Sequence, residues 1–137
     1  MPEDRFPTLW SGSVAVIRMP PEVDVTIADE MREALLSVLN LGASAVVVDM
    51  TRTTFCDSAG ISALVRASRR AAASGAKLRV ASQVPAVLRL FTLVGVTQVV
   101  GVHPDVAGAL GSLPRSYPRT PDPGSGLDAG APRPAEG

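Results

Sequence analysis

Apolar residues recur along this chain at two alternating spacings, one typical of strands and one typical of helices. Short β-branched or wholly apolar runs predict strands, and apolar residues every three or four positions predict helices. Strands that alternate with helices over short loops give right-handed crossovers in a mostly parallel sheet, so the predicted fold class is α/β. Strands are expected at residues 8–10, 13–19, 45–50, 77–81 and 98–102, and helices at residues 26–42, 58–75, 82–95 and 103–110.

Both ends of the chain lack this pattern. Residues 112–137 are rich in proline, glycine and small polar residues, which bury too little apolar surface to offset the entropy of ordering. We therefore expect a flexible N-terminus over residues 1–7, one domain over residues 8–111 and a disordered tail over residues 112–137. The alternative for the tail is a polyproline docking motif, built on Pro118, Pro121 and Pro123.

Composition narrows the class of function. The 13 basic and 13 acidic residues cancel and the arginines are scattered, which argues against a nucleic-acid partner. A single cysteine cannot form an internal disulfide, and a single histidine excludes most metal sites and the usual Ser-His-Asp catalysis. No apolar run approaches the roughly 20 residues of a membrane span, and we expect no apolar signal segment before the first predicted strand. We therefore expect a soluble, cytoplasmic protein that is not an enzyme.

The segment Phe55–Gly60 is the strongest candidate for chemistry, because it joins the buried run 45–50 to the second predicted helix. Ser58 is expected at the N-cap of that helix. In one interpretation its hydroxyl only accepts a backbone hydrogen bond, which contributes about 1 kcal/mol. In the other it accepts a phosphate, which the positive end of the helix tolerates and whose charge, added to that of Asp57, opposes the docking of a partner.

Three blocks of sequence in a fixed order resemble the signature of STAS domains, specifically those of bacterial anti-sigma-factor antagonists. The resemblance extends over nearly all of residues 8–111. It implies a STAS-like, mixed but mostly parallel sheet of four to five strands, with helices packed mainly on one face. The three blocks are Pro21–Asp24, Val46–Met50 continuing through Phe55–Ile61, and Val84–Phe91 followed by Gly95.

The resemblance also implies a partner-switching cycle. In such proteins the unphosphorylated antagonist binds an anti-sigma factor, which is also a serine kinase with the histidine-kinase-like ATPase fold, and a sigma factor is released for transcription. Phosphorylation of the motif serine, which by position is Ser58, ends the interaction, and a PP2C-type phosphatase restores it. ATP and magnesium belong to the kinase, so no cofactor is expected here. The implied partner-binding residues are Asp57, Ser58, Ala59 and Gly60, with Glu22 and Asp24 near the same face.

One residue departs from the family pattern, because Pro21 stands where glycine is common. Proline fixes φ near −65° and lacks an N–H, so the loop that carries Glu22 is expected to be reshaped.

Other functions remain as alternatives. A phosphorelay receiver domain would use Asp49 as its acceptor, but its companion acidic pair is missing and Lys77 falls on the wrong strand. A serine hydrolase would need His103 as the base for Ser58, without a GxSxG motif around the serine. The alternative within the same fold is a STAS scaffold or transporter-accessory module in which Ser58 is only a cap.

Two further features have both a structural and a functional interpretation. Cys56 has no strongly positive neighbour in the sequence, so we expect a buried structural thiol rather than a redox sensor. Arg66, Arg69 and Arg70 project from the second helix away from its apolar face. They form either a solvated helix face or a contact with an acidic surface of a partner.

Overall fold

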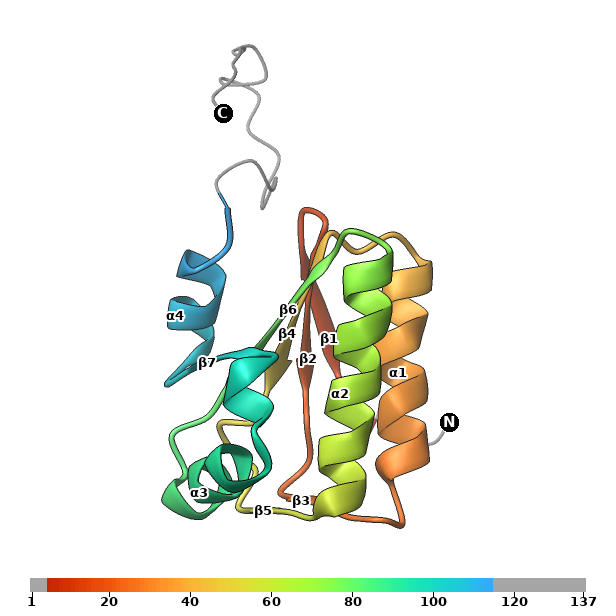
Figure 1. The fold of residues 1–137 in the computed structure, drawn as a ribbon. Coiled ribbons are helices and arrows are strands. Elements are labelled where there is room, and N and C mark those ends of the chain that lie inside the picture. Colours follow the sequence, from red (N-terminus) through yellow and green to blue (C-terminus); the bar gives the residue numbers. More distant parts are fainter. Residues whose placement is uncertain (1–4, 115–137) are drawn as a thin grey trace, which may run out of the picture.

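A five-stranded sheet forms the centre of the computed structural model, which describes residues 5–114 (Figure 1). The strand order is β1-β2-β4-β6-β7, and every pairing is parallel except β1 with β2. This confirms the predicted mostly parallel α/β fold. The strands are β1 (Thr8–Ser11), β2 (Val14–Arg18), β4 (Ala45–Asp49), β6 (Lys77–Ala81) and β7 (Gly101–His103).

Helices cover the two faces of the sheet unequally. On one face α1, α2 and α3 enclose the main core, to which β4 contributes Val46 and Val48. On the other face a smaller cluster joins Ala45 and Val47 of the same strand to Ala109 of α4. Because β4 is covered on both sides, all of its positions are apolar except the last. The helices are α1 (Ala28–Asn40), α2 (Ser58–Ala73), α3 (Pro85–Val94) and α4 (Val106–Gly111).

The predicted strand at residues 98–102 is only partly present. Gly95 ends α3 with a positive φ of 79°, and the chain then forms one turn of 3-10 helix, η1 (Val96–Gln98). Only after this turn does β7 begin, at Gly101. In the predicted run, Gln98 still belongs to this turn, and exposed Val99 and buried Val100 lie between the turn and β7.

A second, two-stranded sheet lies next to the start of α2 and was not predicted. It is formed by β3 (Glu22–Val23) and β5 (Phe55–Cys56), which run parallel, with Val23 opposite Cys56. Figure 1 shows both strands at the end of the molecule where α2 begins. This pairing brings two loops, more than 30 residues apart in the chain, side by side.

The core reaches residues near both margins of the expected domain. Phe6 is buried in the main core, before β1. Leu113 is buried in the smaller cluster, after α4. Residues 1–4 and 115–137, which include the three prolines of the alternative docking motif, lie outside the described residues.

Candidate functional site around Ser58

The parallel pair β3–β5 positions the candidate site. The N–H of Asp57 donates to the carbonyl of Val23 at 3.0 Å, which extends this pairing by one step. The loop that follows β3 therefore lies beside the first turn of α2, in the region where Figure 1 shows β3, β5 and α2 converging. Parallel strands place their carboxyl ends at one edge of a sheet, and functional loops collect there.

The Asp57 carboxylate holds this junction together. It is the N-cap of α2, and its Oδ1 accepts hydrogen bonds from the N–H groups of Ala59 at 2.9 Å and Gly60 at 3.1 Å. Its Oδ2 accepts a third bond, from the N–H of Val25 at 3.1 Å. One carboxylate thus caps the helix and ties the loop after β3 to it.

The prediction that Ser58 is the N-cap is wrong. Ser58 is the first residue of α2, and the capping position belongs to Asp57. Both residue types are good caps, and the end of β5 decides between them by fixing where the helix begins. The Ser58 side chain is exposed, and its hydroxyl has no hydrogen-bond partner within residues 5–114.

Gly60 lies in the first turn of α2, against the small sheet. A Cβ added there would stand 2.6 Å from Cγ1 of Val23 and 2.8 Å from Sγ of Cys56. Contacts this short force a neighbour to move, so the close approach of α2 to β3 and β5 requires glycine. Gly60 is buried, and Ala59 beside it is half-buried.

Cys56 is buried under this turn, as expected for a structural thiol. Burial raises the pKa of the Cys56 thiol from its ordinary value of 9.0 to about 12, and the Asp57 carboxylate contributes to the rise. A raised pKa keeps the sulfur protonated, and the thiol is a much weaker nucleophile than the thiolate.

Glu22 and Asp24 lie on either side of Val23, next to the Asp57 junction. Glu22 is exposed on β3, opposite Phe55. The Asp24 carboxylate accepts hydrogen bonds from the hydroxyl of Thr26 at 2.5 Å and from its N–H at 2.9 Å. These two bonds lower the pKa of Asp24 below its ordinary value. The structure therefore brings all six predicted residues into one region.

Pro21 fits this loop because only its carbonyl is used. That oxygen accepts hydrogen bonds from the N–H of Thr54 at 2.8 Å and from the Thr54 hydroxyl at 3.3 Å. The N–H that proline lacks is not needed for these bonds, and β3 begins at the next residue.

Asp49, which would accept the phosphoryl group if the protein were a receiver domain, makes other contacts in the structure. It is buried at the end of β4, where its Oδ1 accepts from the hydroxyl of Thr51 at 2.6 Å and from its N–H at 3.0 Å. Its Oδ2 lies 3.8 Å from the guanidinium of Arg18.

Within residues 5–114 no group of three or more His, Cys, Asp or Glu side chains is placed to hold a metal ion. The same part of the chain contains no helix long and apolar enough to span a membrane.

Two exposed apolar side chains next to the site were missed by sequence reasoning. Val25 is 71% exposed in the loop after β3, and Phe55 is 51% exposed on β5. Phe55 belongs to the segment singled out from the sequence, but neither residue lies in a periodic run, so the sequence did not indicate that their side chains are exposed. Both lie close to the junction, since the Val25 N–H bonds to the Asp57 carboxylate and Phe55 precedes Cys56 on β5.

Comparison with solved structures gives the same fold. The chain superposes on a crystal structure of an anti-sigma factor antagonist from Mycobacterium paratuberculosis with a TM-score of 0.72 and 22% identity, over 77% of this chain and 90% of that chain. It also matches the phosphorylated form of SpoIIAA, a cell fate determinant of Bacillus, with a TM-score of 0.57 and 19% identity, over 71% of this chain and 89% of that chain.

A third match is a domain within a larger protein. It is the murine anion transporter Slc26a9, solute carrier 26 family member A9, with a TM-score of 0.56 and 20% identity, over 73% of this chain and 17% of that chain. The same fold therefore occurs both alone and as a small part of a transporter.

The STAS domain family model matches residues 8–109. These residues hold the five-stranded sheet, the β3–β5 pair and the Ser58 turn, and the chain therefore belongs to the STAS domain family.

Proposed function

We propose that this protein is an anti-sigma-factor antagonist controlled by phosphorylation of Ser58. In its unphosphorylated form it binds an anti-sigma factor with serine kinase activity and the histidine-kinase-like ATPase fold, and a sigma factor is released. The kinase transfers a phosphoryl group from ATP to the Ser58 oxygen and ends the interaction. A PP2C-type phosphatase removes the phosphate, and the cycle takes place in the cytoplasm.

The observation that carries the proposal is the position of the Ser58 hydroxyl. It is exposed, and it makes no hydrogen bond within the described part of the chain, because Asp57 caps the helix instead. A hydroxyl with no structural contact can be modified without breaking one. The names of two of the structural matches, an anti-sigma factor antagonist and a phosphorylated form of SpoIIAA, support the same function.

Electrostatics supports a switch that changes docking but preserves the fold. A phosphate on Ser58 carries about two negative charges at the positive end of α2, where the helix dipole favours an anion. The same phosphate adds to the carboxylates of Asp57, Glu22 and Asp24, which already lie around the junction. A partner would have to desolvate this concentrated charge in order to bind.

The test of the proposal is phosphosite mapping by mass spectrometry on the protein isolated from its native cell. We expect phosphate on Ser58 and none on neighbouring hydroxyls such as Ser62. In vitro, the purified cognate anti-sigma kinase with ATP should phosphorylate the wild-type protein and leave Ser58→Ala unmodified. Equal phosphorylation of the two proteins would contradict the proposal, and so would a Ser58 that carries no phosphate in the cell.

A STAS module that serves as a scaffold or as a transporter accessory is the second candidate, and the match to the anion transporter Slc26a9 favours it. In that case Ser58 would be an ordinary surface serine. The two candidates differ in what Ser58→Ala does in the cell. The variant should release the sigma factor constitutively if the protein is an antagonist, which a reporter gene would detect, and should have no effect if it is a scaffold.

A further inference from the structure

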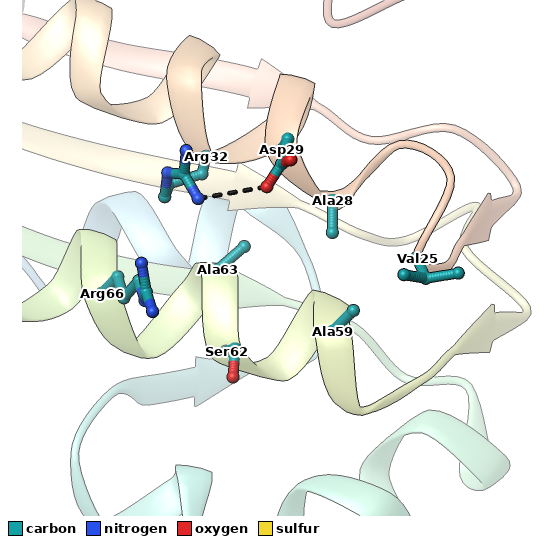
Figure 2. Close-up of a pocket in the computed structure, with 8 residues that line it drawn as sticks. All are labelled: Val25, Ala28, Asp29, Arg32, Ala59, Ser62, Ala63 and Arg66. Carbon is teal, nitrogen blue, oxygen red and sulfur yellow. Dashed lines mark hydrogen bonds and ion pairs between the residues drawn. The ribbon is translucent and has the colours of Figure 1, made fainter.

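A cleft of about 270 Å³ lies between α1 and α2, beside the Ser58 turn (Figure 2). Small side chains create it, because Ala28 of α1 and both Ala59 and Ala63 of α2 leave room between the two helices. Figure 2 shows Val25 at one end of the cleft and two arginines, Arg32 and Arg66, at the other.

The two arginines differ in their contacts. Arg32 is largely covered, and its guanidinium donates to the Asp29 carboxylate at 3.1 Å, in the same helix. Arg66 is exposed and makes neither an ion pair nor a hydrogen bond within residues 5–114. Because Asp29 offsets Arg32, the side chains that line the cleft carry one uncompensated positive charge, on Arg66.

The residues around Arg66 leave its guanidinium available to a group that enters the cleft. Ala28 and Ala63 are buried, and no polar side chain other than those of Asp29, Ser62 and the two arginines lines the cleft. In Figure 2 the Ser62 hydroxyl points away from the guanidinium groups. The planar guanidinium of an arginine binds a carboxylate in bidentate fashion, and the cleft leaves room for such a group beside Arg66.

The geometry points to this cleft as the binding site for an acidic side chain of the docking partner, which Arg66 would bind. This inference rests on the proposed function and adds the chemistry of the partner. Arg66 lies eight residues after Ser58 on α2, which is about 12 Å along the helix, and Val25 lies between the cleft and the Asp57 junction. One partner surface can therefore cover the phosphorylation site, the exposed valine and the cleft.

The charges that line the cleft favour a carboxylate over a phosphate. A glutamate or aspartate side chain matches the single uncompensated charge of Arg66, whereas a dianion would bring a second, unmatched negative charge close to the Asp29 carboxylate. The distance from Ser58 means that Arg66 does not neutralise a phosphate on that serine. Phosphorylation and occupation of the cleft are therefore separate contacts of the same interface.

The first test uses a small carboxylate and needs no partner. The isotope-labelled protein is titrated with N-acetylglutamate amide at constant ionic strength, and amide shifts are followed by NMR. We expect saturable shifts at Ala59, Ala63 and Arg66, with an affinity in the millimolar range. Arg66→Gln should weaken binding at least tenfold. Arg69→Gln, which removes a neighbouring exposed arginine outside the cleft, should change it less than twofold, and the neutral N-acetylglutamine amide should not bind.

Two results would overturn the inference. One is an unchanged affinity in Arg66→Gln, and the other is an equal response to the glutamate and glutamine compounds. The titration does not depend on phosphorylation of Ser58. We expect Ser58→Glu to bind the glutamate compound with an affinity within twofold of that of the wild type. Loss of phosphate at Ser58 in the cell would thus reject the proposed function without affecting this measurement.

The second test uses the anti-sigma kinase that phosphorylates Ser58 in vitro. Arg66→Glu places a negative charge in the cleft and should weaken kinase binding at least tenfold, whereas Arg69→Glu should weaken it less than threefold. Equal weakening by the two variants would indicate a general charge effect and would contradict a seated acidic side chain.

Discussion

Asp57 and Ser58 are neighbours in the chain but do different things in the structure. The Asp57 carboxylate accepts three backbone hydrogen bonds, two within α2 and one from Val25 in another loop. The Ser58 hydroxyl is exposed and accepts none of these bonds. At the scale of single residues, the Asp57 side chain therefore stabilises the turn, and the adjacent Ser58 side chain is the proposed site of modification.

Substitution of Asp57 should lower stability while substitution of Ser58 should not. Asp57→Ala removes the cap and the bond to Val25, and we expect a loss of about 1 to 3 kcal/mol in the free energy of unfolding. Ser58→Ala should stay within about 0.5 kcal/mol of wild type. Urea denaturation followed by circular dichroism measures both values, and Asp57→Asn, which keeps an acceptor oxygen, is the control. A larger loss in Ser58→Ala than in Asp57→Ala would contradict the assignment of the cap.

The Cys56 thiol should be unreactive in the folded protein and should make stability depend on alkaline pH. Burial raises its folded pKa to about 12, whereas the unfolded chain keeps the ordinary value near 9.0. Between these values the folded state binds the proton that the unfolded state loses. The contribution is therefore complete below pH 9 and is lost as pH rises toward 12.

Two measurements check the behaviour of Cys56. A thiol reagent at pH 8 should label the protein slowly in buffer and rapidly in urea. The free energy of unfolding should fall more steeply above pH 9 in the wild type than in Cys56→Ala, which has no proton to lose at this position. Parallel pH profiles for the two proteins would mean that the thiol titrates normally in the folded state.

At the scale of elements, the contact between α2 and the small β3–β5 sheet sets the position of the site. Gly60 is the point of closest approach, since an added Cβ would meet both Val23 and Cys56. Helix α2 in turn packs against α1 and the main sheet in the larger core. The turn that carries Ser58 is therefore fixed by packing and by the Asp57 bonds together.

Gly60→Ala should destabilise the protein although alanine is the better helix former. The gain of about 1 kcal/mol in helix propensity is outweighed by overpacking, and we expect a net loss of about 1 kcal/mol or more in the free energy of unfolding. Gly111→Ala in α4 is the matched control, because an added Cβ there meets nothing within 4 Å. In Gly60→Ala combined with Val23→Ala the loss should be smaller than the sum of the single losses, and strict additivity would show that the close approach is not the cause.

At the scale of the whole molecule, the sheet and its layers could be predicted from the sequence, whereas the details of the site could not. The all-apolar run of β4 and the spaced apolar residues of α1 and α2 each identify one element from local pattern. The β3–β5 pair is different, because two strands of two residues carry no periodicity. Its pairing determines where α2 begins, and so decides that Asp57 and not Ser58 is the cap.

The cleft between α1 and α2 was outside the reach of sequence reasoning for a similar reason. The sequence predicted that Arg66 projects from the second helix. It did not decide whether this arginine is simply solvated or contacts an acidic surface of a partner. Its place opposite Arg32 and Asp29 depends on how two helices, separated by more than 15 residues of chain, pack against each other. Sequence patterns identify such faces but do not align them.

Charge at residue 58 should control docking of the whole domain without unfolding it. Under the proposed function, Ser58→Ala should bind the anti-sigma kinase as tightly as the unphosphorylated wild type, and Ser58→Glu should bind at least tenfold more weakly. Titration calorimetry measures the affinities, and circular dichroism checks that both variants stay folded. Equal affinities in the two variants would contradict the electrostatic account.

The direction of α4 has a practical consequence. Figure 1 shows the chain leaving α4 at the end of the sheet opposite the β3–β5 strands and the first turn of α2. A fluorophore or affinity handle attached just beyond Leu113 would therefore stand at the opposite end of the sheet from the serine. Such a label would leave the proposed docking surface unobstructed and could report on complex assembly in living cells.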